Sequence, residues 1–308
     1  MKLTTCILLF YVQYLYAKKQ IIPCLVHPSL SKKTGKQLPS IHDTNPPNGF
    51  AATYGLRHET NLPFSIDYRK TPGVVTPVRD QGDCGSCWAF SATEALEGQL
   101  GLDGVSQVLA PQTFIDCVRQ DYGCGGGWPD DALAFAEEHG IASEFDYPYQ
   151  GNASGVCKII LDDEAERVPI ATYATVFYEI RANGSDDALR RALWQYGPLS
   201  IAIDASGMLQ DYKSGILNDT ECSTKYPNHA VLLIGYYGTD GSDDNYWIVK
   251  NSWGSNWGED GFVRFSANVT NICGIGMYAT VPYITSPKRY GYRTNYFRHL
   301  RHMISIII

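Results

Sequence analysis

QGDCGSCWAFSATEALEGQL, residues 81–100, joins a loop of small and polar residues to an uninterrupted run with helical spacing. Its apolar positions give a helix a buried face, at Trp88, Phe90, Ala92, Ala95, Leu96 and Leu100. Ser86 stands where it can cap the helix, so Cys87 falls in the first turn. The positive end of a helix dipole lowers the pKa of a thiol, which makes Cys87 a candidate nucleophile. The side-chain amide of Gln81, six residues earlier, can point an N–H at the same place.

A structural role for the pair Cys84-x-x-Cys87 is the alternative, either as a disulfide or as half of a zinc site. A zinc site needs a second such pair. Cys117 and Cys124 are separated by six residues, which does not match the common spacings of zinc ligands. We therefore expect no metal and no cofactor.

The cysteines and glycosylation sequons indicate an oxidising compartment. Two of the nine cysteines, Cys6 and Cys24, lie near the N-terminus, and seven follow, at Cys84, Cys87, Cys117, Cys124, Cys157, Cys222 and Cys273. Seven is odd, so pairing leaves one thiol over, and that thiol is the reactive candidate. Sequons begin at Asn152, Asn183, Asn218 and Asn268. Together these features favour the secretory pathway.

Charge divides the chain into three parts. The net charge is −7, but residues 1–61 and residues 285–308 each carry +5, which leaves −17 on residues 62–284. A central region this acidic excludes a nucleic-acid-binding protein. A basic leader beside an acidic body predicts that the two attract each other.

The two ends of the chain are expected to lie outside the folded body. Residues 1–17 have a charged start, an apolar run and a terminal Ala17, as in a signal peptide. Residues 18–61 are rich in Lys, Pro and Asn without helical period, which indicates a short or divergent leader. The basic tail, residues 285–308, is predicted to be disordered. No other run is long enough to span a membrane.

A thiol nucleophile also needs a general base that takes its proton. Five of the seven histidines lie in the leader or the tail, which leaves His139 and His229. His139 ends an acidic helix, where a cation suits the helix dipole, so we interpret it as structural. His229 begins the apolar run HAVLLIGYY after a polar turn and is the better candidate.

The sequence CGSCWAF at 84–90 resembles the active-site stretch of papain-like cysteine proteases and matches the signature C-G-[SA]-C-[WY] without departure. The resemblance covers about residues 62–284. It extends to the run around His229 and to KNSWG, where Asn251 fits the asparagine that orients the histidine and Trp253 shields their hydrogen bond. Tyr68 departs from the usual Trp, and the leader is about half the length of the family's inhibitory propeptide and lacks its helical pattern.

The expected fold class is α+β, with two domains that meet near residue 170. Helical patterns dominate about residues 62–171, and β-rich runs bounded by Gly, Asn and Asp dominate about residues 172–284. The resemblance implies a helical left domain, an antiparallel β-barrel-like right domain and an active-site cleft between them.

The resemblance implies a cysteine endopeptidase that acts through a Cys87 acyl-enzyme, with His229 as general acid and base and Gln81 in the oxyanion hole. The chain has no histidine-bearing insertion after Cys124, which favours an endopeptidase over an exopeptidase. The alternative is a catalytically inactive secreted homologue that acts as a binding protein. We disfavour it because all four catalytic positions are filled.

The resemblance also implies further residues and partners. Disulfides would join Cys84 to Cys124, Cys117 to Cys157 and Cys222 to Cys273. Substrate would contact Gly126, Gly127, Trp128, Pro129, Ala202, Asn228, Ala230 and Tyr278. The pocket residues carry no charge, so we expect medium apolar side chains two residues before the cleaved bond, in preference to Arg. Partners would be protein and peptide substrates and cystatin-type inhibitors, for a monomer in a lysosome or outside the cell.

Overall fold

The computed structural model describes residues 62–284 except 162, 181, 183 and 239–243. The predicted signal peptide, leader and C-terminal tail lie outside the described residues, as does the sequon at Asn183. No helix among the described residues is both long and apolar enough to cross a membrane.

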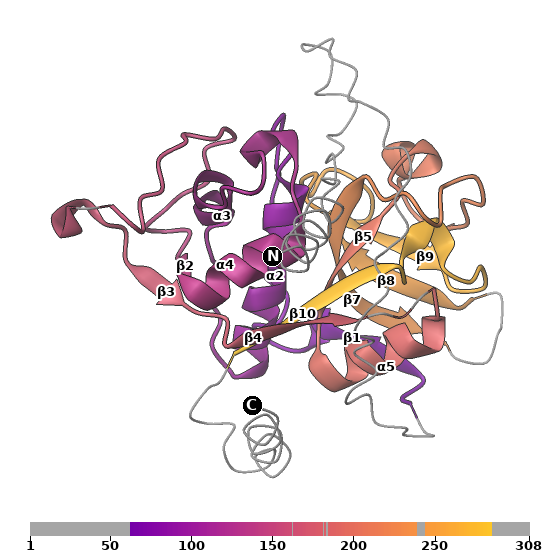
Figure 1. The fold of residues 1–308 in the computed structure, drawn as a ribbon. Helices are drawn as coiled ribbons and strands as arrows, with labels where there is room; N and C mark the ends of the chain where they lie inside the picture. The colour runs from indigo at the N-terminus through magenta and orange to yellow at the C-terminus, as the bar shows by residue number, and fades with distance from the viewer. Residues whose placement is uncertain (1–61, 162, 181, 183, 239–243, 285–308) are drawn as a thin grey trace, which may run out of the picture.

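Helices α2, α3 and α4 gather on one side of the molecule and a large sheet lies on the other, with α5 packed against the sheet (Figure 1). The helices are α2 (Cys87–Leu102), α3 (Pro111–Cys117), α4 (Pro129–Glu138) and α5 (Asp186–Tyr196). Short 3-10 turns lie at Tyr68–Lys70, Gly123–Gly125, Glu164–Glu166, Gly207–Asp211 and Ile272–Gly274. Both α3 and α4 begin with proline, whose fixed φ suits the first helical position.

The large sheet has eight strands, in the order β4-β10-β5-β7-β8-β9-β6, with β1 paired to β7. Their bounds are β1 Ser65–Asp67, β4 Val176–Ile180, β5 Leu199–Ile203, β6 Ile216–Leu217, β7 His229–Tyr237, β8 Tyr246–Lys250, β9 Phe262–Ser266 and β10 Tyr278–Tyr283. All pairs are antiparallel except β6 with β9. The path is open, so the sheet does not close into the expected barrel. Strands β2 (Ile141–Ala142) and β3 (Ile170–Thr172) form a separate small sheet.

Helix α2 is buried on every side, whereas the sequence predicted a single buried face. All its residues from Cys87 to Gly101 are buried. The reason is position: α2 contacts α3 and α4 on one side and β5, β7 and β10 on the other (Figure 1). Ser86 occupies the predicted cap position but makes no capping bond, and its hydroxyl lies 3.0 Å from the Tyr149 hydroxyl instead.

The helical pattern predicted before about residue 171 corresponds to α2, α3 and α4, and the β-rich runs predicted after it correspond to β4, β5, β7, β8 and β9. Helix α5 was not predicted, although Ser185 accepts a bond from the Ala188 N–H at 3.3 Å and acidic residues fill the first turn.

Polar contacts fix α2 against the sheet. The hydroxyl of Ser91 donates to the carbonyl of Val231 on β7 at 2.7 Å and lies 2.6 Å from the hydroxyl of Ser200 on β5. These groups are buried, so leaving any of them unpaired would cost about 1–3 kcal/mol. The first turn of α2 is thereby held at a fixed distance from the start of β7.

The three disulfides that the resemblance implied are present, Cys84–Cys124, Cys117–Cys157 and Cys222–Cys273. The pairing of Cys84 with Cys87, in a disulfide or around zinc, is therefore wrong. Among the described residues, no group of three or more His, Cys, Asp or Glu side chains is placed to hold a metal ion.

Candidate active site

Cys87 and His229 meet where the helices adjoin the sheet. Cys87 is the first residue of α2 and His229 is the first residue of β7. The backbone N–H of Ala230, which follows the histidine, donates to the sulfur of Cys87 at 3.2 Å. The fold therefore places the backbone next to His229 against the sulfur of Cys87, although the two residues are 142 positions apart in the sequence, and both residues are fully buried.

The sulfur of Cys87 is itself in a disulfide in this structure. The other six described cysteines are bonded to one another, as the resemblance implied. That Cys87 is the reactive cysteine of residues 62–284 stays a prediction. A sulfur in a disulfide cannot add to a carbonyl, so the chemistry of this site requires its reduction first.

His229 is oriented by Asn251, as the resemblance implied. Its Nε2 lies 2.7 Å from Oδ1 of Asn251, and that same oxygen accepts the N–H of Ser252 at 2.8 Å. The ring of Trp253 stacks on the imidazole with centroids 4.8 Å apart. Because Nε2 is occupied by the amide, Nδ1 is the ring nitrogen without a hydrogen-bond partner among the described residues.

Burial favours the neutral form of this histidine. It lowers the pKa of His229 to about 4, and the hydrogen bond to Asn251 offsets the fall only in part. A thiolate at Cys87 would add a negative charge beside the ring and raise this pKa. The imidazolium is therefore expected only when the sulfur is a free thiolate.

Gln81 is anchored by the two segments that flank the catalytic pair. Its Nε2 donates to the carbonyl of Cys84 at 3.0 Å, and its Oε1 accepts the hydroxyl of Ser252 at 2.6 Å. The hydroxyl of Tyr149 donates to its backbone carbonyl at 2.6 Å. These bonds fix which way the amide points and leave Nε2 a second N–H. Sequence reasoning did not find these bonds, because Tyr149 carries no motif signal and Ser252, although part of KNSWG, lies 171 positions from Gln81.

Four of the predicted substrate-binding residues lie together. The register of β10, β5 and β7 aligns Tyr278 with Ala202 and Ala202 with Ala230, so the three form one row across the sheet. The ring of Trp128 lies 5.3 Å from the ring of Tyr278. Cross-strand neighbours share a face of the sheet, so these residues form one apolar wall beside Cys87.

The glycine loop before α4 packs against the residue next to Cys87. A Cβ at Gly127 would lie 2.7 Å from the ring of Trp88, and Gly126 has φ of 115°, a conformation that favours glycine. The ring nitrogen of Trp88 donates to the carbonyl of Gly123 at 3.1 Å. Pro129, the first residue of α4, is buried directly after this loop.

The side chain of Asn228 is engaged within the protein. Its Nδ2 donates to Asp204 at 2.6 Å and to the hydroxyl of Ser206 at 2.8 Å, and its Oδ1 accepts the N–H of Ala205 at 2.7 Å. The backbone N–H of Asn228 is engaged as well, since it donates to the carbonyl of Ile203 at 2.9 Å. His139, interpreted as structural, caps the end of α4 and packs on Phe135.

The three described sequons are compatible with glycan attachment, because Asn152, Asn218 and Asn268 are all exposed.

Comparison with known proteins agrees with this geometry. Residues 62–283 match the model of the family described as "Papain family cysteine protease". Mouse cathepsin K is 42% identical over 74% of this chain and 67% of its own length. Cathepsin L of Sarcophaga peregrina is 40% identical over 75% of this chain and 67% of its own length. The chain belongs to the papain family of cysteine proteases and is a cysteine peptidase.

Solved structures show the same fold. Digestive procathepsin L 3 of Tenebrio molitor larval midgut has a TM-score of 0.66 and 34% identity, over 89% of this chain and 78% of that one. Bromelain from Ananas comosus, solved with the E64 inhibitor, has a TM-score of 0.65 and 36% identity, over 73% of this chain and 100% of that one.

Proposed function

We propose that the chain is a cysteine endopeptidase with Cys87 as nucleophile, His229 as general acid and base and Asn251 as the residue that orients His229. The observation that supports this most is the contact of His229 Nε2 with Asn251 at 2.7 Å, which leaves Nδ1 for a proton from Cys87. The short contact of Cys87 with the N–H of Ala230 keeps the sulfur beside the histidine.

In the proposed reaction the Cys87 thiolate adds to a peptide carbonyl carbon, and the N–H groups of Cys87 and Gln81 hold the oxyanion. Each such donor is worth about 3–4 kcal/mol in comparable sites. The C–N bond then breaks as the imidazolium of His229 passes its proton to the leaving amine. Water adds to the thioester, gives its proton to His229 and releases the acid with the thiolate.

The apolar wall beside Cys87 supports a preference for medium apolar side chains two residues before the cleaved bond. Tyr278 and Trp128 are in contact, which shortens the space between them, while Ala202 and Ala230 leave room at the sides. The described wall offers no counter-charge, so a buried Arg would be uncompensated. Discrimination between neighbouring apolar residues should be about 1–3 kcal/mol per methylene.

The domain boundary near residue 170, glycan attachment at the exposed sequons and a lysosomal or secreted location belong to the same proposal. The name of one relative supports the secreted location: digestive cysteine proteinase 2 of Homarus americanus is 41% identical to this chain. Cystatin-type inhibitors are expected partners of a monomer with this site.

The test is active-site titration of the reduced full-length chain with a thiol-directed epoxide, followed by mass spectrometry. We expect one equivalent to attach at Cys87, and peptide hydrolysis to fall in proportion. Cys87→Ala serves as the matched control and should neither react nor hydrolyse. A reduced wild type that takes up the epoxide but cleaves no peptide would favour the inactive binding protein.

A further inference from the structure

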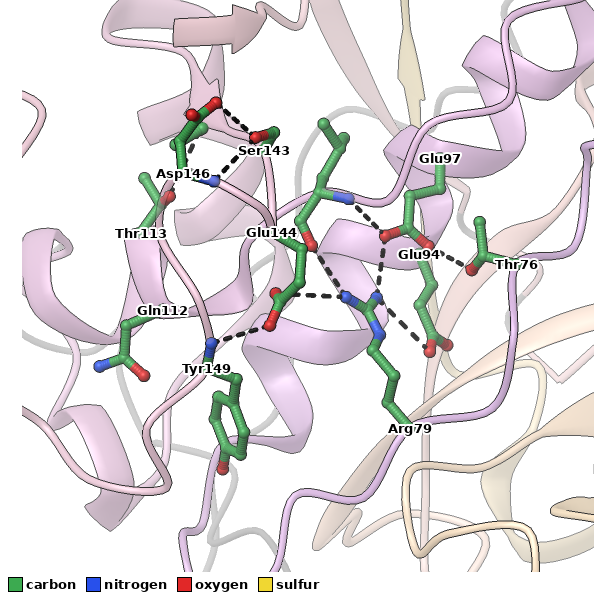
Figure 2. Close-up of polar contacts among 12 residues, drawn as sticks. Thr76, Arg79, Glu94, Glu97, Gln112, Thr113, Ser143, Glu144, Asp146 and Tyr149 are labelled. Atoms are coloured by element: carbon green, nitrogen blue, oxygen red, sulfur yellow. Dashed lines mark hydrogen bonds and ion pairs between the residues drawn. The ribbon is translucent and has the colours of Figure 1, made fainter. Parts of the chain in front are cut away.

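A buried cluster of charged side chains lies where α2 meets β8, apart from the groups used in the proposed reaction. Three carboxylates face two cations in it. Figure 2 shows four of these five side chains converging, two of them from α2 and the other two from separate loops. We call it the charge cluster; it consists of Arg79, Glu94, Glu97, Glu144 and Lys250.

One ion pair of the cluster crosses from a helix to the sheet. Nζ of Lys250 lies 2.8 Å from Oε1 of Glu94, and the two side chains are 0% and 3% exposed. Nζ also donates to the hydroxyl of Thr76 at 3.2 Å, and that hydroxyl donates in turn to Glu97. The charged end of Lys250 is therefore held by oxygens on two other segments.

A second set of contacts surrounds the guanidinium of Arg79. It lies 2.9 Å from Glu97, 3.8 Å from Glu94 and 3.9 Å from Glu144, and it donates to the carbonyl of Leu109 at 2.8 Å (Figure 2). Arg79 shares Glu94 with Lys250. The cluster is thus one connected network.

Buried charges are a poor way to gain stability, because desolvation offsets most of the Coulomb attraction. A pair such as Glu94 and Lys250 could be replaced by apolar side chains at little net cost in stability. A charged pair does, however, favour one relative placement of the two elements that carry it. An apolar contact is not directional and tolerates small shifts between the elements. The position of the pair in the fold therefore matters more than its energy.

That position links the two sides of the active site. Glu94 lies two helical turns after Cys87 on α2, which transmits its position rigidly. Lys250 is the last residue of β8 and directly precedes Asn251, whose amide orients His229. The ion pair thus joins the element that carries the nucleophile to the strand end that carries the orienting amide.

We propose that Glu94 and Lys250 are positioning residues that set the placement of Asn251, and through it His229, relative to Cys87. The proposal rests on the proposed function. Neither residue touches substrate; each acts through the element that carries it.

The experiment compares Glu94→Gln, Lys250→Met and the double variant with wild type, all as reduced full-length chains. For each, kcat is expressed per site titrated by the epoxide, so that unfolded molecules do not count. We expect each single change to lower kcat per site at least tenfold, with KM within about twofold. The double variant should lose no more than the worse single variant, because it removes both members of the ion pair and leaves neither of them without its partner.

A second readout separates positioning from a purely structural role. The pH profile of Cys87 alkylation by iodoacetamide reports the Cys87–His229 pair, and we expect its acid limb to shift in Glu94→Gln. Asp219→Asn is the matched control. Asp219 is 2% exposed and accepts the N–H groups of Met208 and Glu221, away from the charge cluster. This variant should lose stability but keep its kcat per site and its profile.

The proposal is wrong if Glu94→Gln retains kcat per site within twofold of wild type, or if the losses of the two single variants simply add. Glu94→Gln is nearly isosteric, so its kcat per site tests the positioning proposal even if Lys250→Met fails to fold. Failure of the proposed function looks different, because wild type itself would then hydrolyse no peptide.

Discussion

Cys87 has to be a thiolate to react, yet its sulfur is in a disulfide in this structure. We therefore predict that the oxidised chain does not take up a thiol-directed epoxide and that dithiothreitol exposes one reactive site. The measurement is epoxide uptake by mass spectrometry before and after reduction. Full uptake without reductant would contradict it.

His229 provides a second prediction at the scale of one residue, for the oxidised chain. Its pKa falls from 6.5 to about 4 on burial, so the unfolded state binds the proton first as the pH drops. Stability from the neutral ring is complete above pH 6.5 and is lost as the pH falls toward 4. Between pH 7 and pH 5 we expect a loss of about 2 kcal/mol from this group.

Urea unfolding of wild type and His229→Gln at both pH values measures this effect. The difference between the two proteins should shrink at pH 5, and it should depend less on pH after reduction, because a thiolate raises the pKa of the ring. A difference that stays constant across the pH range would show that His229 does not titrate in this way.

The sequence predicted the residues that lie in motifs but not the residues that anchor them. Cys87, His229 and Asn251 carry strong local motifs, and the structure brings them together. The anchoring of Gln81 by Ser252 and Tyr149 was not predictable, because it depends on how distant loops meet. The pairing of Glu94 with Lys250 was not predictable for the same reason, because the sequence alone does not show which residue a charged side chain in an apolar run will contact.

At the scale of elements, α2 shows what periodicity cannot predict. Its apolar spacing indicates one buried face, but the helix lies between other helices and the sheet, so its polar residues are buried as well. A hydrophobic pattern reports which residues avoid water. It does not report which polar residues find partners inside the protein, as Ser91 does on β7 and β5.

The close packing of α2 provides a test. A Cβ at Gly101 would lie 2.1 Å from the carbonyl oxygen of Gly73, a backbone atom that cannot move aside easily. We expect Gly101→Ala to lower the free energy of unfolding by about 1–3 kcal/mol or more, although alanine favours helices. Gly98→Ala is the matched control, since its Cβ would meet side-chain atoms of Pro198 at 3.1 Å. Urea unfolding measures both; equal stability of the two variants would contradict the argument.

The register of β10, β5 and β7 predicts how specificity changes. Tyr278 lies at the end of the row that continues through Ala202 and Ala230, and its ring contacts Trp128. Tyr278→Ala should admit Phe more readily two residues before the cleaved bond, and Tyr278→Glu should recruit Arg there through a new counter-charge. Cleavage profiles of a peptide library give the answer. A wild type that prefers Arg over Leu, or a Tyr278→Ala enzyme with an unchanged profile, would exclude Tyr278 from this role.

At the scale of the whole molecule, the order of secondary structure was largely predictable and its assembly was not. Alternation and turn residues indicated the runs that became β7, β8 and β9, but strand order depends on pairing across long loops. The parallel pair of β6 with β9 and the addition of β1 to β7 leave no local signal. The α+β class with an antiparallel-rich sheet is confirmed, and among the described residues that sheet is not closed.

The charge of the whole molecule provides the last prediction. Residues 1–61 and the tail carry +5 each and the whole chain carries −7, so residues 62–284 carry −17 and repel one another near neutral pH. Burial raises the pKa of the carboxyls of Glu94, Glu144 and Asp186 above the ordinary value. Groups of this kind bind protons on folding, so their contribution to stability is present at acid pH and is lost as the pH rises through the raised pKa.

We therefore expect the reduced enzyme to hydrolyse peptides best below neutral pH, where protonation relieves the repulsion, while its basic leader loses attraction to the body. The pH–rate profile of kcat/KM at low and high salt measures this. Salt screens exposed charges, so about 0.5 M NaCl should raise activity near neutral pH more than at pH 5. An enzyme with no activity below neutrality, or one whose profile does not respond to salt, would show that the charge of the body does not set its working range.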